Sequence, residues 1–376
     1  MKVVDSGYVF DPREAPLHQR SCAFTTVTLA SDGTLLVACR RGSERDSLDG
    51  HDCIFASSDS GQSWEVRYDG FGKGAWDDRA GEVKSVAIAE TAPGQLTATG
   101  LWVDRSNPQR PFINPKTQGL LPMRIFHAVS TDGGKTWGAR RQMDISPHLA
   151  ASPSSSAVLQ LPDGVLAQPY EHWKEYDDPA PGRPAARLRL SFDQGQTWPT
   201  FVTVAQHPAN GRFYWDERLA VHPQTGQLVA MFWTHDPNAK VDVDVHIAWG
   251  TPDGRSWTEP VGTGLPGQHC QPIPVGGDRL VAVYARRRDP PGIAAALSDD
   301  FGQTWDPAQG TTIYDSSAGT ESGAEGPRDQ ADLWSDMEAW RFGHPRGVLL
   351  PSGEVFCAFY AGDNKIKRVH WARLEM

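Results

Sequence analysis

Carboxyl groups that could act on a sugar occur in short clusters with aromatic and basic residues. Glu171 lies in the run Tyr170–Trp173, Glu217 lies in the run Trp215–Arg218, and Asp46 lies in a loop crowded with charge. A pair of carboxyl groups can divide the acid and base roles of glycoside hydrolysis between them. Each carboxylate could also be a solvated surface group or the cap of a strand. The positions of these residues in the fold decide between the two interpretations.

Basic side chains add a second kind of chemistry. The run Arg286–Arg288 offers guanidinium groups, which suit a carboxylate better than any other side chain, although such a run could also be plain surface. His235, His269 and His344 could hold a metal or serve as the base of a lyase. No HxH or HExxH spacing is present, so we expect no metal and no cofactor.

A repeated motif indicates the elements that position these residues. The pattern S-x-D-x-G-x-[ST]-W occurs in full at residues 57–64, 130–137, 191–198 and 298–305, and an eroded copy ends at Trp257. Its Asp can accept bonds from backbone N–H groups of its own turn, its Gly supplies a positive φ, and its Trp buries a large ring. We therefore interpret these aspartates as parts of a folding motif for a hairpin and not as catalytic residues.

Glycine-containing turns recur in step with that motif. Six of them, at Gly33, Gly94, Gly164, Gly226, Gly277 and Gly353, separate pairs of short apolar segments, and each reads as a hairpin. About four strands per unit is the content of a propeller blade. The sequence predicts an all-β, six-bladed β-propeller with four-stranded antiparallel blades, formed as one domain by residues 1–376. The long polar stretch 307–340 is expected to be an insertion before the last blade.

This strand order predicts which side chains meet at one rim. The start of the first strand and the end of the second strand of each blade should lie at one end of the channel, and the glycine turns at the other. A rim rich in aromatic and charged groups suggests a pocket for a polar ligand such as a sugar. The residues expected there are Arg20, Arg40, Arg41, Asp46 and Asp49; Lys84, Trp102 and Asp104; Tyr170, Glu171, His172 and Trp173; Asp216, Glu217, Trp233, Thr234 and His235; His269, Gln271, Tyr284 and Arg286 to Arg288; and Arg341, Phe342, His344 and Tyr360.

Bulk properties exclude several classes of function. The formal net charge of −10 argues against general nucleic-acid binding, which needs a basic footprint. Five cysteines without a CxxC spacing make a disulfide framework and a thiolate zinc site unexpected. The N-terminus has no apolar segment of signal-peptide length, and no stretch is long enough to span a membrane. We expect a cytoplasmic protein, or a secreted one if a leader has been removed, with a carbohydrate partner and no membrane association. The sequence leaves its oligomeric state open.

The Asp boxes and the hairpin order resemble the sialidase (neuraminidase) superfamily, the BNR-repeat proteins. The resemblance covers nearly the whole chain. It implies a sugar-binding propeller in which arginines clamp a carboxylate, an Asp is the acid/base, and a Tyr nucleophile is assisted by a Glu. On this basis Asp46 corresponds to the acid/base and Glu217 to the partner Glu. The clamp arginines correspond to Arg20, Arg40 and Arg286.

The sequence departs from the sialidase pattern at two places. Trp233 to His235 stand where a clamp arginine is expected, and Phe342 stands where we look for the nucleophilic Tyr. Phenylalanine has no hydroxyl group and cannot be a nucleophile. These departures predict that ordinary sialidase activity is weak or missing.

Three functions remain from the sequence. The leading one is a sialidase-like glycoside hydrolase for a terminal, acidic sugar, with Asp46, Glu217 and Glu171 as catalytic candidates. Its candidate binding residues are Arg20, Arg40, Arg286, Tyr170, His172, Trp173, Trp233, His235, Phe342 and His344. The second is a two-carboxylate glycosidase, in which Glu171 and Glu217 on adjacent blades would act as in exo-arabinanases, or a uronate lyase that uses His and Tyr. The third is a non-catalytic carbohydrate-binding propeller.

Overall fold

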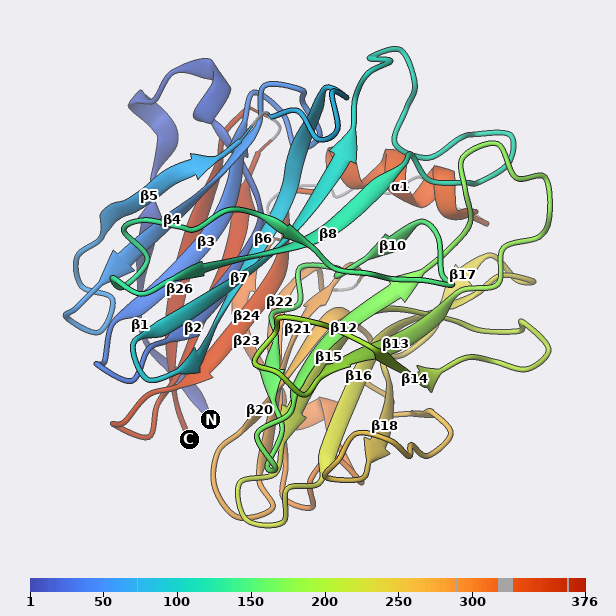
Figure 1. Ribbon diagram of the computed structural model, residues 1–376. Helices are drawn as coiled ribbons and strands as arrows, with labels where there is room; N and C mark the ends of the chain where they lie inside the picture. Colours follow the sequence, from blue (N-terminus) through green and yellow to red (C-terminus); the bar gives the residue numbers. More distant parts are fainter. Residues whose placement is uncertain (73, 289, 317–326, 364) are drawn as a thin grey trace.

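The chain folds into antiparallel β-sheets arranged in a ring, as a computed structural model shows for residues 1–72, 74–288, 290–316, 327–363 and 365–376 (Figure 1). Four sheets are separate from one another. They contain β6 (Gly81–Ala92), β7 (Gln95–Asp104), β8 (Met123–Ser130) and β9 (Arg141–Gln142); β10 (Ala151–Ser152), β11 (Leu159–Gln160), β12 (Leu166–His172), β13 (Ala185–Ser191) and β14 (Thr200–Ala205); β15 (Phe213–Val221), β16 (Leu228–Asp236), β17 (Val241–Asp242), β18 (His246–Gly250) and β19 (Val261–Gly262); and β20 (Gln268–Pro274), β21 (Leu280–Arg286), β22 (Gly292–Ser298) and β23 (Thr311–Asp315).

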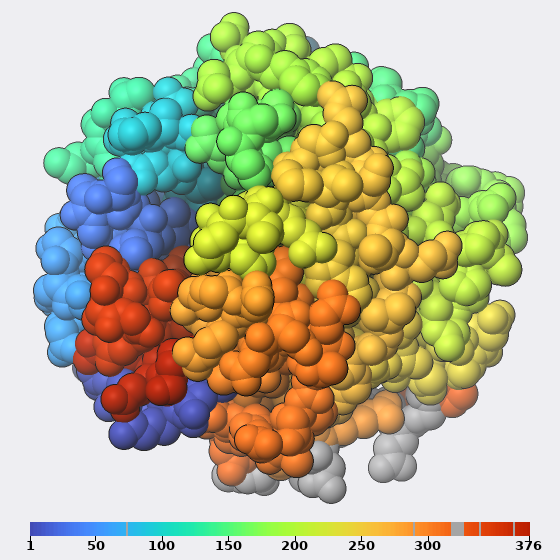
Figure 2. Space-filling view, turned by 90° about the horizontal axis from the view of Figure 1, so that it is seen from below, coloured from blue at the N-terminus to red at the C-terminus, as the bar shows by residue number. Residues whose placement is uncertain are grey.

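The remaining eight strands form one larger sheet that joins the two ends of the chain. It contains β1 (Lys2–Phe10), β2 (Ser21–Leu29), β3 (Leu35–Gly42), β4 (His51–Ser57) and β5 (Glu65–Phe71) with β24 (Phe342–Leu349), β25 (Val355–Gly362) and β26 (Lys367–Glu375). The N-terminal strand β1 pairs with the C-terminal strand β26, and a single parallel pair, Ser21 with Lys367, links β26 to β2. In Figure 2 the colours follow the chain around the ring, and the red C-terminal segment lies beside the blue N-terminal one.

The expected fold is therefore confirmed as an all-β propeller with antiparallel blades. Apolar strand residues pack between neighbouring sheets, as in the cluster of Leu36, Ile54, Val86 and Ala98 between the β2–β5 strands and the β6–β9 sheet.

The aspartate of each full Asp box accepts hydrogen bonds from its own turn. Asp132, for example, accepts the backbone N–H of Thr136 at 2.9 Å and the Thr136 hydroxyl at 2.6 Å. The hydrogen bonds of the turn lower the pKa of Asp132, so this carboxylate is structural.

The polar stretch 307–340 is an insertion only in part. It begins with the 3₁₀-helix η3 (Pro307–Gln309) and then supplies β23, which is the outer strand of the β20–β22 sheet. After residues 317–326, which lie outside the described residues, the chain forms α1 (Gln330–Ala339), which a capping box of Asp329 and Asp332 begins. Two further 3₁₀-helices, η1 (Pro12–Glu14) and η2 (Leu17–Gln19), lie between β1 and β2. Within the described residues, no helix has the length and apolar character that a membrane crossing requires.

Candidate functional site

A β-bulge recurs in the first strand of successive sheets and turns side chains toward one place. The pairing register shifts between Ala23 and Thr26 in β2, and matching shifts occur in β6, β15, β20 and β24. A β-bulge re-aims a side chain and is common next to active sites. Four of the residues inside these bulges adopt a left-handed backbone although none is glycine: Phe24 (φ 54°), Asp216 (φ 52°), His269 (φ 47°) and His344 (φ 47°).

The equivalent place in the remaining sheet is the segment between β10 and β11. Ser154 and Ser155 there have φ values of 46° and 58°. Left-handed backbone at non-glycine residues is unfavourable, and it tends to cluster at functional sites. One cavity is lined by residues from the bulges of β2, β6, β15, β20 and β24 and from the segment between β10 and β11. These residues are Phe24, Lys84, Ser154, Ser155, Asp216, His269 and His344. We call this set the bulge ring.

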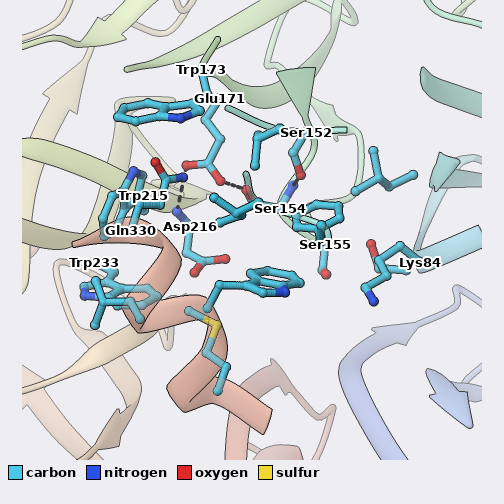
Figure 3. A pocket seen from close by; sticks show the side chains of 18 of the residues that line it. Lys84, Ser152, Ser154, Ser155, Glu171, Trp173, Trp215, Asp216, Trp233 and Gln330 are labelled. Atoms are coloured by element: carbon cyan, nitrogen blue, oxygen red, sulfur yellow. Dashed lines mark hydrogen bonds between the residues drawn. The ribbon is translucent and has the colours of Figure 1, made fainter. Parts of the chain in front are cut away.

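The cavity has a volume of about 130 Å³ and aromatic walls. Trp173, Trp215 and Trp233 form one side, as Figure 3 shows. Helix α1 covers another side with Leu333, Trp334 and Met337, and the Trp334 ring stacks on Phe112 at a centroid distance of 4.3 Å. A mostly apolar cavity with a few convergent polar groups is the usual form of a small-molecule site.

Two carboxyl groups from neighbouring sheets enter this cavity. Glu171, at the end of β12, accepts a hydrogen bond from the Ser154 hydroxyl through Oε1 and from the Asp216 backbone N–H, at 3.2 Å, through Oε2 (Figure 3). Asp216, in the β15 bulge, lies 3.1 Å from Arg218 Nη2 and 2.8 Å from His269 Nδ1. The bulge thus brings the backbone of one acidic residue against the carboxyl group of the other.

The surroundings drive the pKa values of these two carboxyl groups apart. Burial and the negative charge of Asp216 raise the pKa of Glu171 well above its ordinary value. Burial acts in the same direction on Asp216, but the nearby His269 and Arg218 outweigh it and lower the pKa of Asp216. Of the two, Glu171 is therefore the carboxyl group that keeps its proton to higher pH, and Asp216 is the one that ionises first.

Two histidines continue the ring beside Asp216. Burial lowers the pKa of His269 and holds that of His344 far below the ordinary value, so both rings are neutral near pH 7. The two rings stack at a centroid distance of 4.3 Å. His269 Nε2 is buried and has no hydrogen-bond partner among the described residues. His235 lines a neighbouring cavity instead and pairs with Asp242 at 2.9 Å.

Eight of the residues expected at the rim line the cavity: Lys84, Glu171, His172, Trp173, Asp216, Trp233, His269 and His344. Asp46 lies at its edge, where its carboxylate pairs with Lys84, with Arg105 at 3.2 Å, and with the Trp334 indole N–H at 3.3 Å. Glu217 is buried next to the site and does not line the cavity. Its carboxyl oxygens have no hydrogen-bond partner among the described residues, and burial raises its pKa.

The three arginines expected to clamp a carboxylate do not come together. Arg20 donates from Nε to the Ala15 carbonyl at 2.8 Å. Arg40 is buried in an ion pair with Glu82 at 2.7 Å and donates to the Val83 carbonyl at 2.9 Å, so it anchors the loop after β3. Arg286, the last residue of β21, donates to the carbonyl of Pro290. None of the three lines the cavity, and their expected convergence is corrected accordingly.

Two aromatic candidates also lie outside the cavity. Tyr170 is buried below it, with its hydroxyl group 2.9 Å from His148 Nδ1. Phe342 is fully buried in the apolar core between the β20–β23 sheet and β24–β26, and the guanidinium of Arg287 lies 4.8 Å from its ring centroid. The position where we looked for a nucleophilic tyrosine is therefore a core position.

Lys84, Asp216, His269 and His344 were expected at this rim, and a further sequence signal, which we did not use, joins them to the rest of the bulge ring. Phe24 precedes the turn glycine Gly33 by nine residues, and Lys84 and Asp216 each precede theirs by ten. His269 and His344 precede theirs by eight and nine. Counting back from each turn would have selected these positions as one set. Arg45 and Trp334, from a loop and from α1, carry no such signal.

Among the described residues, no group of three or more His, Cys, Asp and Glu side chains could hold a metal ion.

Comparisons with known proteins identify the fold. No family model matches the chain, and no curated protein matches it significantly. A protein of unknown function from Dyadobacter fermentans is similar with a TM-score of 0.73 and 18% identity, over 100% of this chain and 99% of that chain. The Hadza microbial sialidase Hz136 is similar with a TM-score of 0.67 and 15% identity, over 99% and 68%. An α-L-arabinanase from Penicillium chrysogenum, complexed with arabinobiose, is similar with a TM-score of 0.63 and 12% identity, over 100% and 99%. At these identities the likeness shows a propeller fold shared with glycoside hydrolases, and the fold alone.

Proposed function

We propose that this propeller is a glycoside hydrolase that removes a terminal sugar, with Glu171 as the proton donor and Asp216 as its ionised partner. The solved structures that share the fold include a sialidase and an arabinanase, which supports a carbohydrate substrate. The proposal also divides the eight-stranded sheet at the Ser21–Lys367 pair into two blades, which gives six blades in all.

One observation carries the assignment of roles. Glu171 and Asp216 face the same cavity, and their surroundings raise the pKa of one and lower that of the other. Such a divergence separates the general acid from the ionised base or nucleophile in two-carboxyl enzymes. Glu171 then gives its proton to the glycosidic oxygen as the bond to the anomeric carbon breaks. Asp216 activates the incoming water or attacks the anomeric carbon itself.

The shape of the cavity supports cleavage at a chain end. A protein cavity of roughly 150 Å³ holds one benzene ring. On this scale the cavity here, at about 130 Å³, takes no more than one ring beneath α1. Trp173, Trp215 and Trp233 offer apolar faces for the C–H groups of a sugar.

The buried histidine favours a second candidate, elimination instead of hydrolysis. Asp216 lies 2.8 Å from His269 Nδ1, and Nε2 is left without a partner among the described residues. An imidazole held in this way can act as a general base. In a uronate lyase it would remove the proton at C5 while the bond to the leaving oxygen at C4 breaks, and the product would contain a new double bond.

A hydrolysis screen tests the proposal. The substrates are phenyl glycosides of sialic, uronic, arabinosyl and rhamnosyl donors, since plain phenol is a weak acid and needs a proton to leave. The variants are Glu171→Gln, Asp216→Asn and, as a matched control, Asp49→Asn. Asp49 accepts from the Ser43 backbone N–H at 3.1 Å and does not line the cavity. We expect turnover of at least one donor, a loss of at least about a hundredfold in the two cavity variants, and no loss in the control.

Two outcomes would contradict hydrolysis. Turnover that survives both cavity substitutions would place the chemistry elsewhere. A product with the ultraviolet absorbance of a conjugated double bond, and no free reducing sugar from C1 cleavage, would establish the lyase.

A further inference from the structure

Arg45 is a buried cation that has no anionic partner among the residues that the structure describes. It lies in the loop between β3 and β4, and the residue is only 2% exposed. Its Nε and Nη1 atoms have no hydrogen-bond partner among the described residues. Its Nη2 atom lies 3.3 Å from the Met337 sulfur, and its guanidinium carbon lies 4.7 Å from the ring centroids of both Phe24 and Trp334. The guanidinium therefore touches two rings and a thioether.

Other buried arginines of the chain differ from Arg45 in this respect. Arg40 pairs with Glu82 at 2.7 Å, and Arg218 pairs with Asp216 at 3.1 Å. Arg346 donates to the Ser155 carbonyl at 2.8 Å. A charge removed from water normally needs a paired anion or several oxygen acceptors. Contacts with aromatic faces compensate only a part of that requirement.

Arg45 also faces the place where a ligand would lie. It lines the same cavity as Glu171 and Asp216 but approaches it from the loop after β3, whereas the two carboxyl groups come from β12 and β15. Both of these carboxyl groups have other partners in the structure. The Asp46 carboxylate next to Arg45 in the chain pairs with Lys84 and Arg105. None of these described carboxylates is therefore available to Arg45, and a ligand in the cavity would supply the anion.

We propose that Arg45 binds the carboxylate of the substrate, and that the terminal sugar is a hexuronate. This inference rests on the proposed function, because it takes the ligand of the cavity to be a sugar. A carboxylate would accept hydrogen bonds from the guanidinium, which is the geometry that arginine recognises best. The sugar ring would then extend from Arg45 toward Glu171 and Asp216.

The small size of the cavity favours the smaller of the acidic sugars. Its volume of about 130 Å³ is close to that of a cavity that holds one benzene ring, so every added substituent counts against a ligand. A nine-carbon acidic sugar carries an acylamino group and a three-carbon side chain in addition to its carboxylate, and it therefore fits this space less well. A hexuronate adds only the carboxylate carbon and its oxygens to the ring and its hydroxyl groups.

Direct binding measurements test the inference without depending on turnover. The probes are D-glucuronate and D-galacturonate, with D-glucose, D-galactose and N-acetylneuraminate for comparison, titrated calorimetrically and by tryptophan fluorescence. We expect a hexuronate to bind at least about tenfold more tightly than its neutral hexose, since a hydrogen-bonded ion pair discriminates by that factor or more. We expect Arg45→Met to abolish the difference and Arg45→Lys to weaken it while the fold is retained.

The matched control is Arg189→Met. Arg189 is also buried, but it donates to the Trp198 and Ser146 carbonyls and does not line the cavity. This variant should keep the preference for the hexuronate. Equal binding of hexuronate and hexose, no hexuronate binding at all, or an unchanged preference in Arg45→Met would each overturn the inference. N-acetylneuraminate that binds as tightly as the hexuronate would overturn the choice of sugar. Failure of the proposed function looks different, because a hexuronate would still bind while no glycoside is cleaved.

Discussion

Contacts that the chain provides locally shift the pKa values of Glu171 and Asp216 in opposite directions. The bulge in β15 places the Asp216 backbone N–H against Glu171, and it directs the Asp216 side chain toward His269 and Arg218. The β15 bulge thus places the Asp216 carboxylate beside the Arg218 cation, and it leaves Glu171 beside the negative charge of Asp216. A strained left-handed residue, with φ of 52° at Asp216, is the local condition for this arrangement.

This arrangement predicts how activity depends on pH. Glu171 must be protonated, and its pKa is raised, so activity should extend to higher pH than an ordinary glutamate would allow and fall as pH rises through that pKa. Asp216 must be ionised, and its pKa is lowered, so no loss is expected on the acid side until well below the usual range of an aspartate. The measurement is kcat/KM against pH on the best aryl glycoside, because this ratio reports the pKa values of the free enzyme.

The Asp216→Asn variant provides the control for that profile. The negative charge of Asp216 contributes to the raised pKa of Glu171, so the residual activity of this variant should decline at a lower pH than that of the wild type. An unchanged position of the alkaline decline would show that Asp216 does not act on the Glu171 proton.

A second residue-scale prediction concerns sialosides. No tyrosine is among the described residues that line the cavity, and Phe342 lies in the core. A tyrosine nucleophile is therefore missing from the place where the covalent intermediate would form. We expect an aryl sialoside to be turned over at least about a hundredfold more slowly than the best donor of the screen. Brisk sialoside turnover that collapses in Asp46→Ala would show an ordinary sialidase mechanism instead.

At the scale of elements, the Asp-box hairpins are separate from the chemistry. Asp132 is held by Thr136, Lys135 and Ser130 within its own turn, and it does not line the cavity. Asp132→Ala should lower the melting temperature, because it removes the acceptor for these groups, and it should leave KM unchanged. Calorimetry and kinetics on one preparation check both statements. A raised KM with an unaltered melting temperature would be the opposite result.

The regular elements could be predicted from the sequence because their signals are local. An Asp box and a glycine turn each specify a hairpin through a few neighbouring residues. The left-handed backbone of Phe24, Asp216, His269 and His344 could not be predicted in this way, although their spacing from the turn glycines is regular. Residues other than glycine adopt this conformation only rarely. Tertiary packing imposes it. Helix α1 was missed as well, because residues 330–339 read as part of a polar stretch and their apolar contacts are with distant residues such as Phe112.

The candidate site shows the same limit. Glu171, Trp173 and Trp233 were found because they end strands that the hairpin pattern places at one rim. Arg20, Arg40 and Arg286 satisfy the same pattern, yet each is occupied by a local carbonyl or carboxylate. A sequence pattern predicts the end of the propeller at which a residue lies, but it does not predict which group the side chain contacts there.

At the scale of the whole molecule, the ring is closed by the two ends of the chain. Strand β1 pairs with β26 along nearly its whole length, and the termini lie close together in Figure 1. Deletion of residues 1–10 would expose the edge of β26 and the apolar groups that β1 covers. We expect the truncated protein to melt at a lower temperature and to self-associate, and addition of a β1 peptide should partly restore the melting temperature. An unchanged melting temperature in the truncated protein would show that the ring is stable without this closure.

The central claim is that Glu171 protonates the leaving oxygen, and the dependence of turnover on the leaving group tests it most directly. An acidic phenol such as 2,4-dinitrophenol departs without a proton, whereas a simple alcohol needs one. In Glu171→Gln we expect only a small loss of kcat/KM for the dinitrophenyl glycoside and a loss of at least about a hundredfold for the methyl glycoside of the same sugar. An equal loss for both substrates would contradict the account, because it would show that Glu171 does not deliver the proton.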